Sequence, residues 1–235
     1  MGSIANTYDN FAKTFSKSRA NMKWPEIDYF ISLMKKKNLE KANILDIGCG
    51  NGRLLNYLQP LFWVLAKNPE ADFENPNNLE SFKKNFISYI GIDSSAGMIN
   101  EAKKLFPKYN FRQLDMLEID KIIETKFDFI FFLASFHHLQ DTGSRLEVLG
   151  KTREILAKDG MIFMTNWNLL GEKNFAKYKD SYNKNGDFEI KIGDFSRYYH
   201  GFRADELEEL FTKSDFQILE NRIFEGENNI ISVLN

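Results

Sequence analysis

The chain has 235 residues, 43% of them hydrophobic, and a net charge of −2 at pH 7, which is enough for one substantial core and one or at most two domains. The longest strongly apolar run, residues 129–136, is far shorter than the roughly 18 to 20 residues that span a bilayer. Residues 1–15 lack the apolar core of a secretory signal, and Cys49 as the single cysteine excludes an internal disulfide. We therefore expect a cytoplasmic protein without membrane contact.

Helical and extended patterns alternate along the chain. Residues 26–39 carry apolar side chains at helical spacing after Trp24-Pro25, and strand 43–48 and helix 52–59 follow. Further strands are predicted at 87–95, 109–115, 127–135, 160–167, 216–224 and 229–235, and further helices at 96–106, 144–157 and 204–214. This alternation predicts an α/β fold: a mostly parallel seven-stranded sheet with helices on both faces, completed by two antiparallel strands.

Two stretches do not fit the alternation. Residues 60–85 are rich in Pro and Asn, which indicates an irregular insertion. Residues 168–201 lie between a strand and a helix, and we expect them to form a loop on the substrate side, because long loops in compact domains are usually functional or disordered. All 235 residues are expected to form one domain, with N-terminal helices within residues 1–41.

Three glycines stand at alternate positions directly after the first strand: Gly48, Gly50 and Gly52. Glycine permits positive φ and close approach of a ligand to the backbone, and ligands of parallel sheets bind at the carboxyl ends of the strands. A dinucleotide fingerprint would need glycine at position 53, where Arg53 stands. The alternative to a ligand site is a turn whose glycines serve packing alone.

Together with Asp46, these glycines form a D-x-G-x-G-x-G pattern that resembles motif I of the class I S-adenosylmethionine-dependent methyltransferases. In that family the loop passes under the methionine part of the cofactor. The resemblance implies S-adenosylmethionine as cofactor and the Rossmann-like class I methyltransferase fold.

The next two strand ends extend this resemblance. Asp93, followed by Ser94, matches the acidic residue that accepts both ribose hydroxyls of the cofactor, since a carboxylate offers two acceptor oxygens. Asp115 and Met116 match the pair that contacts the adenine. An acid at a strand end is otherwise often a helix cap. The three histidines and the single cysteine form no metal-ligand spacing, so no metal site is expected.

Several segments carry a closer resemblance: 8–30, 46–53, 91–99, 135–139 and 197–211. They look like the tRNA methyltransferases that esterify the carboxymethyl group of a modified wobble uridine. The resemblance implies a tRNA anticodon loop as partner and, by comparison with eukaryotic relatives, a small activating protein partner. No DNA partner is expected.

The family resemblance also points to residues near the methyl acceptor. Arg19, Arg197 and His200 match positions near the active site, and His138 follows the fourth strand, where acceptors usually lie. A carboxylate acceptor is already ionised at pH 7 and needs no general base, so cations that position it should suffice. An arginine can hold a carboxylate or a phosphate through two hydrogen bonds.

Aromatic side chains complete the expected acceptor site. Trp24, Tyr198 and Tyr199 are predicted to stack on a base. The alternative is that Trp24 is a hydrophobic staple beside Pro25 and that one of the two tyrosines belongs to the core.

Two other functions are compatible with the sequence. The first is a small-molecule methyltransferase in which the aromatic residues close a pocket over a metabolite. The second is a non-catalytic subunit that binds the cofactor and supports a partner. The flanking segments 1–41 and 168–203 are mildly basic, which permits an anionic substrate, whereas the isoelectric point of about 6.0 does not indicate RNA binding.

Overall fold

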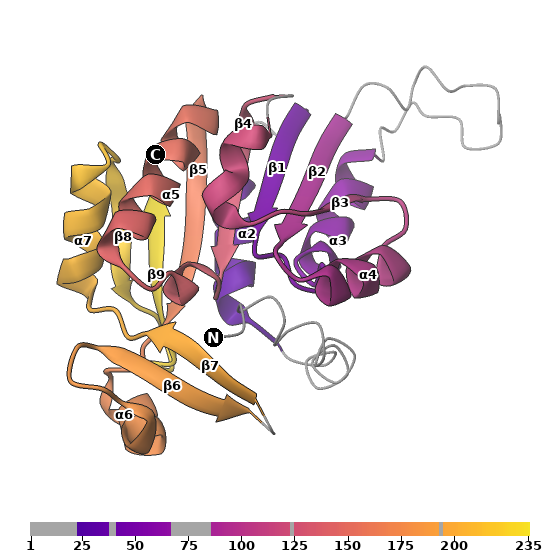
Figure 1. The fold of residues 1–235 in the computed structure, drawn as a ribbon. Helices are drawn as coiled ribbons and strands as arrows, with labels where there is room; N and C mark the ends of the chain where they lie inside the picture. The colour runs from indigo at the N-terminus through magenta and orange to yellow at the C-terminus, as the bar shows by residue number, and fades with distance from the viewer. Residues whose placement is uncertain (1–22, 38–40, 67–85, 123–124, 193–194) are drawn as a thin grey trace, which may run out of the picture.

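The computed structural model describes residues 23–37, 41–66, 86–122, 125–192 and 195–235, and its centre is a seven-stranded sheet in the order β3-β2-β1-β4-β5-β9-β8 (Figure 1). The strands are β1 Lys41–Ile47, β2 Phe86–Asp93, β3 Asn110–Gln113, β4 Phe127–Leu133, β5 Leu156–Trp167, β8 Ile218–Ile223 and β9 Asn229–Leu234. The neighbours among β1 to β5 pair in parallel, whereas β9 is antiparallel to both β5 and β8. The α/β fold expected from the sequence is confirmed.

Helices cover both faces of the sheet. On one face lie α2 Pro25–Met34, α3 Leu55–Ala66 and α4 Ala96–Leu105, and on the other lie α5 Thr142–Ile155, α7 Ala204–Lys213 and the short 3-10 helix η2 Met116–Lys121. A hydrophobic core lies on each face of the sheet: the first core is on the α2, α3 and α4 side, and the second is on the α5 and α7 side. Successive side chains of a strand point to opposite faces, so Phe129 and Phe131 of β4 belong to the first core and Ile130 and Phe132 to the second.

The first core is rich in aromatic rings. The ring of Phe163 on β5 lies 5.0 Å from that of Phe30 on α2 and 5.1 Å from that of Phe131 on β4. Helix α2 reaches this cluster through Ile27, Phe30, Ile31 and Met34, whose spacing puts them on one stripe of the helix. Phe163 therefore joins the N-terminal helix to the centre of the sheet.

Two helix boundaries differ from those expected. Helix α2 ends at Met34, and residues 38–40 lie outside the described part. Helix α3 continues through Pro60 to Ala66, so residues 60–66 are helical, and the expectation of irregular structure there was wrong. Leu55, Leu58 and Leu61 are buried at helical spacing on both sides of the proline, and this burial offsets the hydrogen bond that proline removes. Residues 67–85 of the expected insertion are not described.

The segment 168–201 contains regular structure that its sequence did not lead us to expect. It holds helix α6 Glu172–Tyr178 and the strands β6 Asp187–Ile192 and β7 Phe195–His200, which pair as a two-stranded antiparallel sheet. Leu169, Phe188, Ile190 and Tyr199 form a small core of their own beneath it. In Figure 1 this hairpin and α6 lie beside the edge at which β1 and β4 end.

No helix within the described ranges combines the length and apolar character that crossing a bilayer requires.

The aromatic cluster gives a stability prediction. We expect Phe163→Ala to lower the free energy of unfolding by about 3–5 kcal/mol, because it leaves a cavity between α2 and the sheet. Leu219→Ala is the control, since its side chain on β8 is 45% exposed and its loss should change stability by about 0.5 kcal/mol or less. Urea denaturation measures both, and equal effects would contradict the assignment of Phe163 to the core.

Candidate active site

A cavity of about 310 Å³ lies at the carboxyl ends of the parallel strands. Its wall includes ten residues that the sequence singled out: Trp24, Asp46, Gly48, Gly50, Asp93, Ser94, Asp115, Met116, His138 and Tyr199. Gly52, Arg197, Tyr198 and His200 do not line it, and Arg19 lies outside the described residues. The structure thus gathers most of the expected cofactor residues around one space and places several expected acceptor residues behind its wall.

The glycine turn forms the floor of the cavity. Gly48 has φ +72°, and a Cβ there would lie 2.4 Å from the Cβ of Ser135, so close packing excludes any side chain. A Cβ on Gly52 would meet the ring of Phe111 at 2.8 Å. At Gly50 the nearest atom within 4 Å, the terminal methyl of Met98, would be 3.3 Å from such a Cβ, and this glycine borders the cavity. Two glycines therefore serve packing, and Gly50 leaves room for a ligand.

Asp93, at the end of β2, braces the turn. One carboxylate oxygen accepts a hydrogen bond from the Gly50 amide at 2.9 Å, and the other accepts one from the Ser95 amide at 2.9 Å. The Ser95 hydroxyl in turn accepts from the Met98 amide and caps α4. Asp93 also borders the cavity.

The ends of β2 and β3 continue the same wall. The Ser94 carbonyl accepts a hydrogen bond from the Gln113 side chain at 3.2 Å. Asp115 caps η2, because one of its carboxylate oxygens accepts from the Leu117 amide at 2.9 Å. Asp115 is thus both a helix cap and a cavity residue beside Met116.

Asp46 is a buried carboxylate facing the cavity. One oxygen accepts a hydrogen bond from the Tyr89 hydroxyl at 2.8 Å, and the other is buried without a hydrogen-bond partner among the described residues. Burial raises the pKa of Asp46 to about 7, although the Tyr89 hydrogen bond and the charge of Arg53 act in the opposite direction. A bound cation would favour the ionised carboxylate at this place.

Trp24 and Arg53 form the adjoining wall. The guanidinium of Arg53 lies 3.9 Å from the centre of the Trp24 ring, which is cation–π geometry. The backbone amide of Trp24 donates to the Tyr57 hydroxyl at 2.9 Å. Trp24 therefore packs in the core at the start of α2 and also borders the cavity.

The opposite end of the cavity is aromatic. The rings of Tyr199 on β7 and Trp167 at the end of β5 are stacked at 4.9 Å with an angle of 10° between their planes. The His138 ring, in the short helix η3 Phe136–His138, lies 4.8 Å from that of Tyr199. Trp167 was not singled out in the sequence, although it closes a predicted strand at the ligand-binding edge.

His137 is buried and His138 is partly buried at this end. His138 Nδ1 donates to the Tyr198 carbonyl at 3.0 Å, and burial lowers the pKa of His138 to about 4, with the charge of Arg197 acting in the same direction. His137 Nδ1 accepts from the Trp167 amide at 3.2 Å, and burial holds the pKa of His137 well below its usual range. Both rings are therefore neutral at pH 7, and Nε2 of His138 carries the lone pair.

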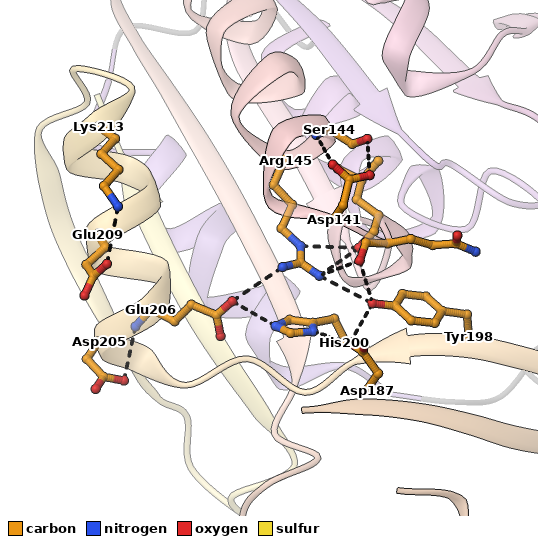
Figure 2. A network of polar contacts seen from close by, with 12 residues as sticks. Asp141, Ser144, Arg145, Asp187, Tyr198, His200, Asp205, Glu206, Glu209 and Lys213 are labelled. Carbon is orange, nitrogen blue, oxygen red and sulfur yellow. Dashed lines mark hydrogen bonds and ion pairs between the residues drawn. The ribbon is translucent and has the colours of Figure 1, made fainter. Parts of the chain in front are cut away.

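The remaining expected acceptor residues lie on β7 outside the cavity. Arg197 is buried, and its positive charge acts on His138. Tyr198 and His200 belong to a polar network with Arg145, Asp187 and Glu206 (Figure 2). Sequence reasoning missed those three residues. In the described part of the chain, no three His, Cys, Asp or Glu side chains gather in a way that could hold a metal ion.

A family model described as a methyltransferase domain matches residues 19–221. The chain belongs to this family. Curated relatives of this methyltransferase include two tRNA (carboxymethyluridine(34)-5-O)-methyltransferases. The Schizosaccharomyces pombe protein is 25% identical over 93% of this chain and 90% of its own length. The Saccharomyces cerevisiae protein is 28% identical over 71% of this chain, which spans only about half, 48%, of that longer relative.

Other relatives have different names. The ubiquinone/menaquinone biosynthesis C-methyltransferase UbiE of Campylobacter jejuni is 27% identical over 77% of this methyltransferase and 68% of its own length. Among solved structures, an S-adenosylmethionine-dependent methyltransferase from Clostridium acetobutylicum superposes with a TM-score of 0.66 and 16% identity, covering 97% of this chain and 98% of its own. That similarity shows the fold.

S-adenosylmethionine is the cofactor of this methyltransferase. The cavity fits it in two respects: Gly50 leaves space where any side chain would intrude, and Asp46 offers a buried oxygen to a cationic group. The carboxylates of Asp93 and Asp115 can accept hydrogen bonds from a nucleoside further along the same wall.

The glycine turn gives a binding prediction. We expect Gly50→Arg to abolish S-adenosylmethionine binding in calorimetry, because the side chain would fill the cavity. Gly226→Arg is the matched control: Gly226 also has positive φ, +81°, but the nearest atom to a Cβ there would be 3.8 Å away, and Gly226 does not line the cavity. Unchanged affinity in Gly50→Arg, or equal loss in both variants, would contradict this placement of the cofactor.

Burial of Asp46 gives a pH prediction. Because its pKa of about 7 in the folded protein exceeds the ordinary value of 3.8, the folded chain holds this proton more tightly, and stability falls as pH rises toward 7. Asp46→Asn should remove a slope of about 1.4 kcal/mol per pH unit between roughly pH 5 and pH 7. Urea denaturation at several pH values measures it. The exposed Asp120, replaced by Asn, is the control, and an unchanged slope in Asp46→Asn would contradict the raised pKa.

Proposed function

We propose that this methyltransferase transfers the methyl group of S-adenosylmethionine to the carboxymethyl group of a modified uridine at the wobble position of tRNA. When bound, S-adenosylmethionine would supply a sulfonium methyl group: the acceptor oxygen attacks the methyl carbon in line with the carbon–sulfur bond, which breaks to release the neutral thioether, and no proton is transferred when that oxygen is already ionised.

The observation that carries this proposal is the setting of His138: its Nδ1 donates to the Tyr198 carbonyl at 3.0 Å and its ring packs 4.8 Å from that of Tyr199. Desolvation there lowers the pKa of His138 to about 4, so its imidazole is a weak base at neutral pH. Asp46, whose pKa is about 7, lies beneath the glycine turn, and Asp141 is engaged in capping α5 through the Ser144 amide. A carboxylate acceptor suits such a site because it needs no general base.

The shape and charge of the acceptor end are also compatible with a modified uridine. The stacked rings of Trp167 and Tyr199 offer a flat wall for a base. We propose that Arg19, in the part of the chain that is not described, orients the carboxylate through the oxygen that does not attack, and that Arg197 contributes its positive charge from behind His138 without touching the acceptor. A cation on the attacking oxygen would lower its nucleophilicity. The two tRNA methyltransferases among the relatives support the same acceptor.

A small molecule is the second candidate acceptor, and the UbiE relatives favour it. The same aromatic wall would accommodate a planar metabolite. A C-methylation, however, needs a base to generate the carbon nucleophile, and the described acceptor end offers the weakly basic His137 and His138 and the helix-capping Asp141, whose pKa is lowered.

The decisive experiment uses the purified chain, tritiated S-adenosylmethionine and tRNA that carries unesterified carboxymethyluridine. We expect label in the tRNA that mild alkali releases as methanol, because a methyl ester is hydrolysed whereas carbon-bound and nitrogen-bound methyl groups are not. Gly50→Arg should transfer nothing, and Gly226→Arg should match the wild type.

Three results would overturn the proposal. Alkali-resistant label in tRNA would exclude the ester. Label in a metabolite extract but not in tRNA would establish the small-molecule alternative. Cofactor binding without transfer to either would leave the non-catalytic subunit.

A further inference from the structure

Strand β7 separates two environments. Its residues alternate between the two faces of the hairpin, as in any strand. Tyr199 points into the cavity, where its ring contacts His138 and Trp167. Its neighbours Tyr198 and His200 point the other way, into the polar network of Figure 2. Whatever fixes Tyr198 and His200 therefore also fixes Tyr199.

His200 lies between two carboxylates. Its Nδ1 is 2.6 Å from an oxygen of Asp187, the residue that pairs with it across the hairpin, and its Nε2 is 2.8 Å from an oxygen of Glu206 on α7. The side chain of His200 is only 8% exposed. Both ring nitrogens are thus engaged, and the contact joins the hairpin to a helix of the main domain.

Arg145 of α5 connects this contact to the cavity wall. Its buried guanidinium lies 3.5 Å from Glu206 and donates to the Tyr198 hydroxyl at 3.4 Å. It also donates to the Leu139 carbonyl at 3.0 Å, directly after His138 in the chain. The network therefore holds the segment that carries His138 and the strand that carries Tyr199 at the same time.

A second link runs through the backbone. The Tyr198 carbonyl accepts the hydrogen bond from His138 Nδ1, while the single proton of the Tyr198 hydroxyl is donated to Asp187 at 2.7 Å, with the Gln140 carbonyl as an alternative acceptor at 3.1 Å. A shift of β7 would break the His138 hydrogen bond and move the Tyr199 ring together.

We propose that His200 is a positioning residue: through Asp187 and Glu206 it fixes the β6–β7 hairpin on the methyltransferase domain, and so sets the orientation of His138 and Tyr199 without touching the acceptor. This role differs from the place near the reacting groups that the family resemblance implies for His200. The inference rests on the proposed function only for the identity of the acceptor.

The test compares His200→Gln and Glu206→Ala with the matched control Glu209→Ala. Glu209 is one turn further along α7, where its exposed carboxylate contacts only Lys213 among the ion pairs of the described residues, at 3.5 Å (Figure 2). Each protein is prepared with ¹⁵N-labelled histidine, and its ring nitrogens are observed by NMR spectroscopy. The chain has three histidines, so the ring nitrogens of His138 can be assigned and followed.

We expect both test variants to shift the His138 ring signals away from those of the Nδ1-protonated form. The KM for tRNA should rise about tenfold, since small misplacements at a site have effects of this size or larger. Calorimetric affinity for S-adenosylmethionine should change less than about twofold, since the glycine turn is remote from the network. Glu209→Ala should match the wild type in all three measurements.

Unchanged His138 signals in both variants would overturn the inference. So would a lower kcat at constant KM in His200→Gln, which would indicate direct participation in the reaction, or an equal loss of cofactor binding, which would indicate general unfolding. The spectroscopic measurement needs no acceptor. If the wild-type protein is inactive on tRNA but the two variants still show the expected shifts of the His138 signals, the proposed acceptor is refuted and the positioning role remains.

Discussion

The end of β2 holds the whole cofactor side of the molecule in place. The Ile92 carbonyl accepts hydrogen bonds from the amides of both Gly48 and Cys49, each at 2.9 Å, and the Asp93 carboxylate joins the Gly50 amide to the start of α4. The turn after β1 thereby takes its shape from the neighbouring strand rather than from its own residues alone. The glycine turn and the start of α4 are both positioned by this junction.

The gathering of the expected cofactor residues around one cavity could be predicted from sequence because its determinants are local. A parallel sheet brings successive strand ends to one edge, so Asp46, Asp93 and Asp115 had to lie near one another once three strands were identified. Alternate glycines indicated a turn with positive φ, which the backbone has at Gly48 and Gly50. What the spacing could not show is that a Cβ on Gly48 would clash with Ser135, whereas Gly50 borders the cavity with only the Met98 methyl close by.

The acceptor side was harder to predict because it depends on contacts between distant segments. Asp187, Arg145 and Glu206 come from three different elements, and no spacing in the sequence relates them. The hairpin did leave a signal, the dipeptide Gly193-Asp194 between two runs of alternating residues. Had residues 195–200 been identified as a strand, alternation would have placed Tyr199 on the face opposite Tyr198 and His200.

The alternation in β7 restricts how this part of the chain can change in evolution. Substitution of the exposed Ser196 does not change the face of the hairpin to which each neighbouring side chain points. Insertion or deletion of a single residue between Ser196 and Tyr199 would instead exchange the two faces, sending a cavity side chain into the polar cluster and a charged partner into the cavity. Homologues should therefore vary in side-chain identity here far more readily than in strand length.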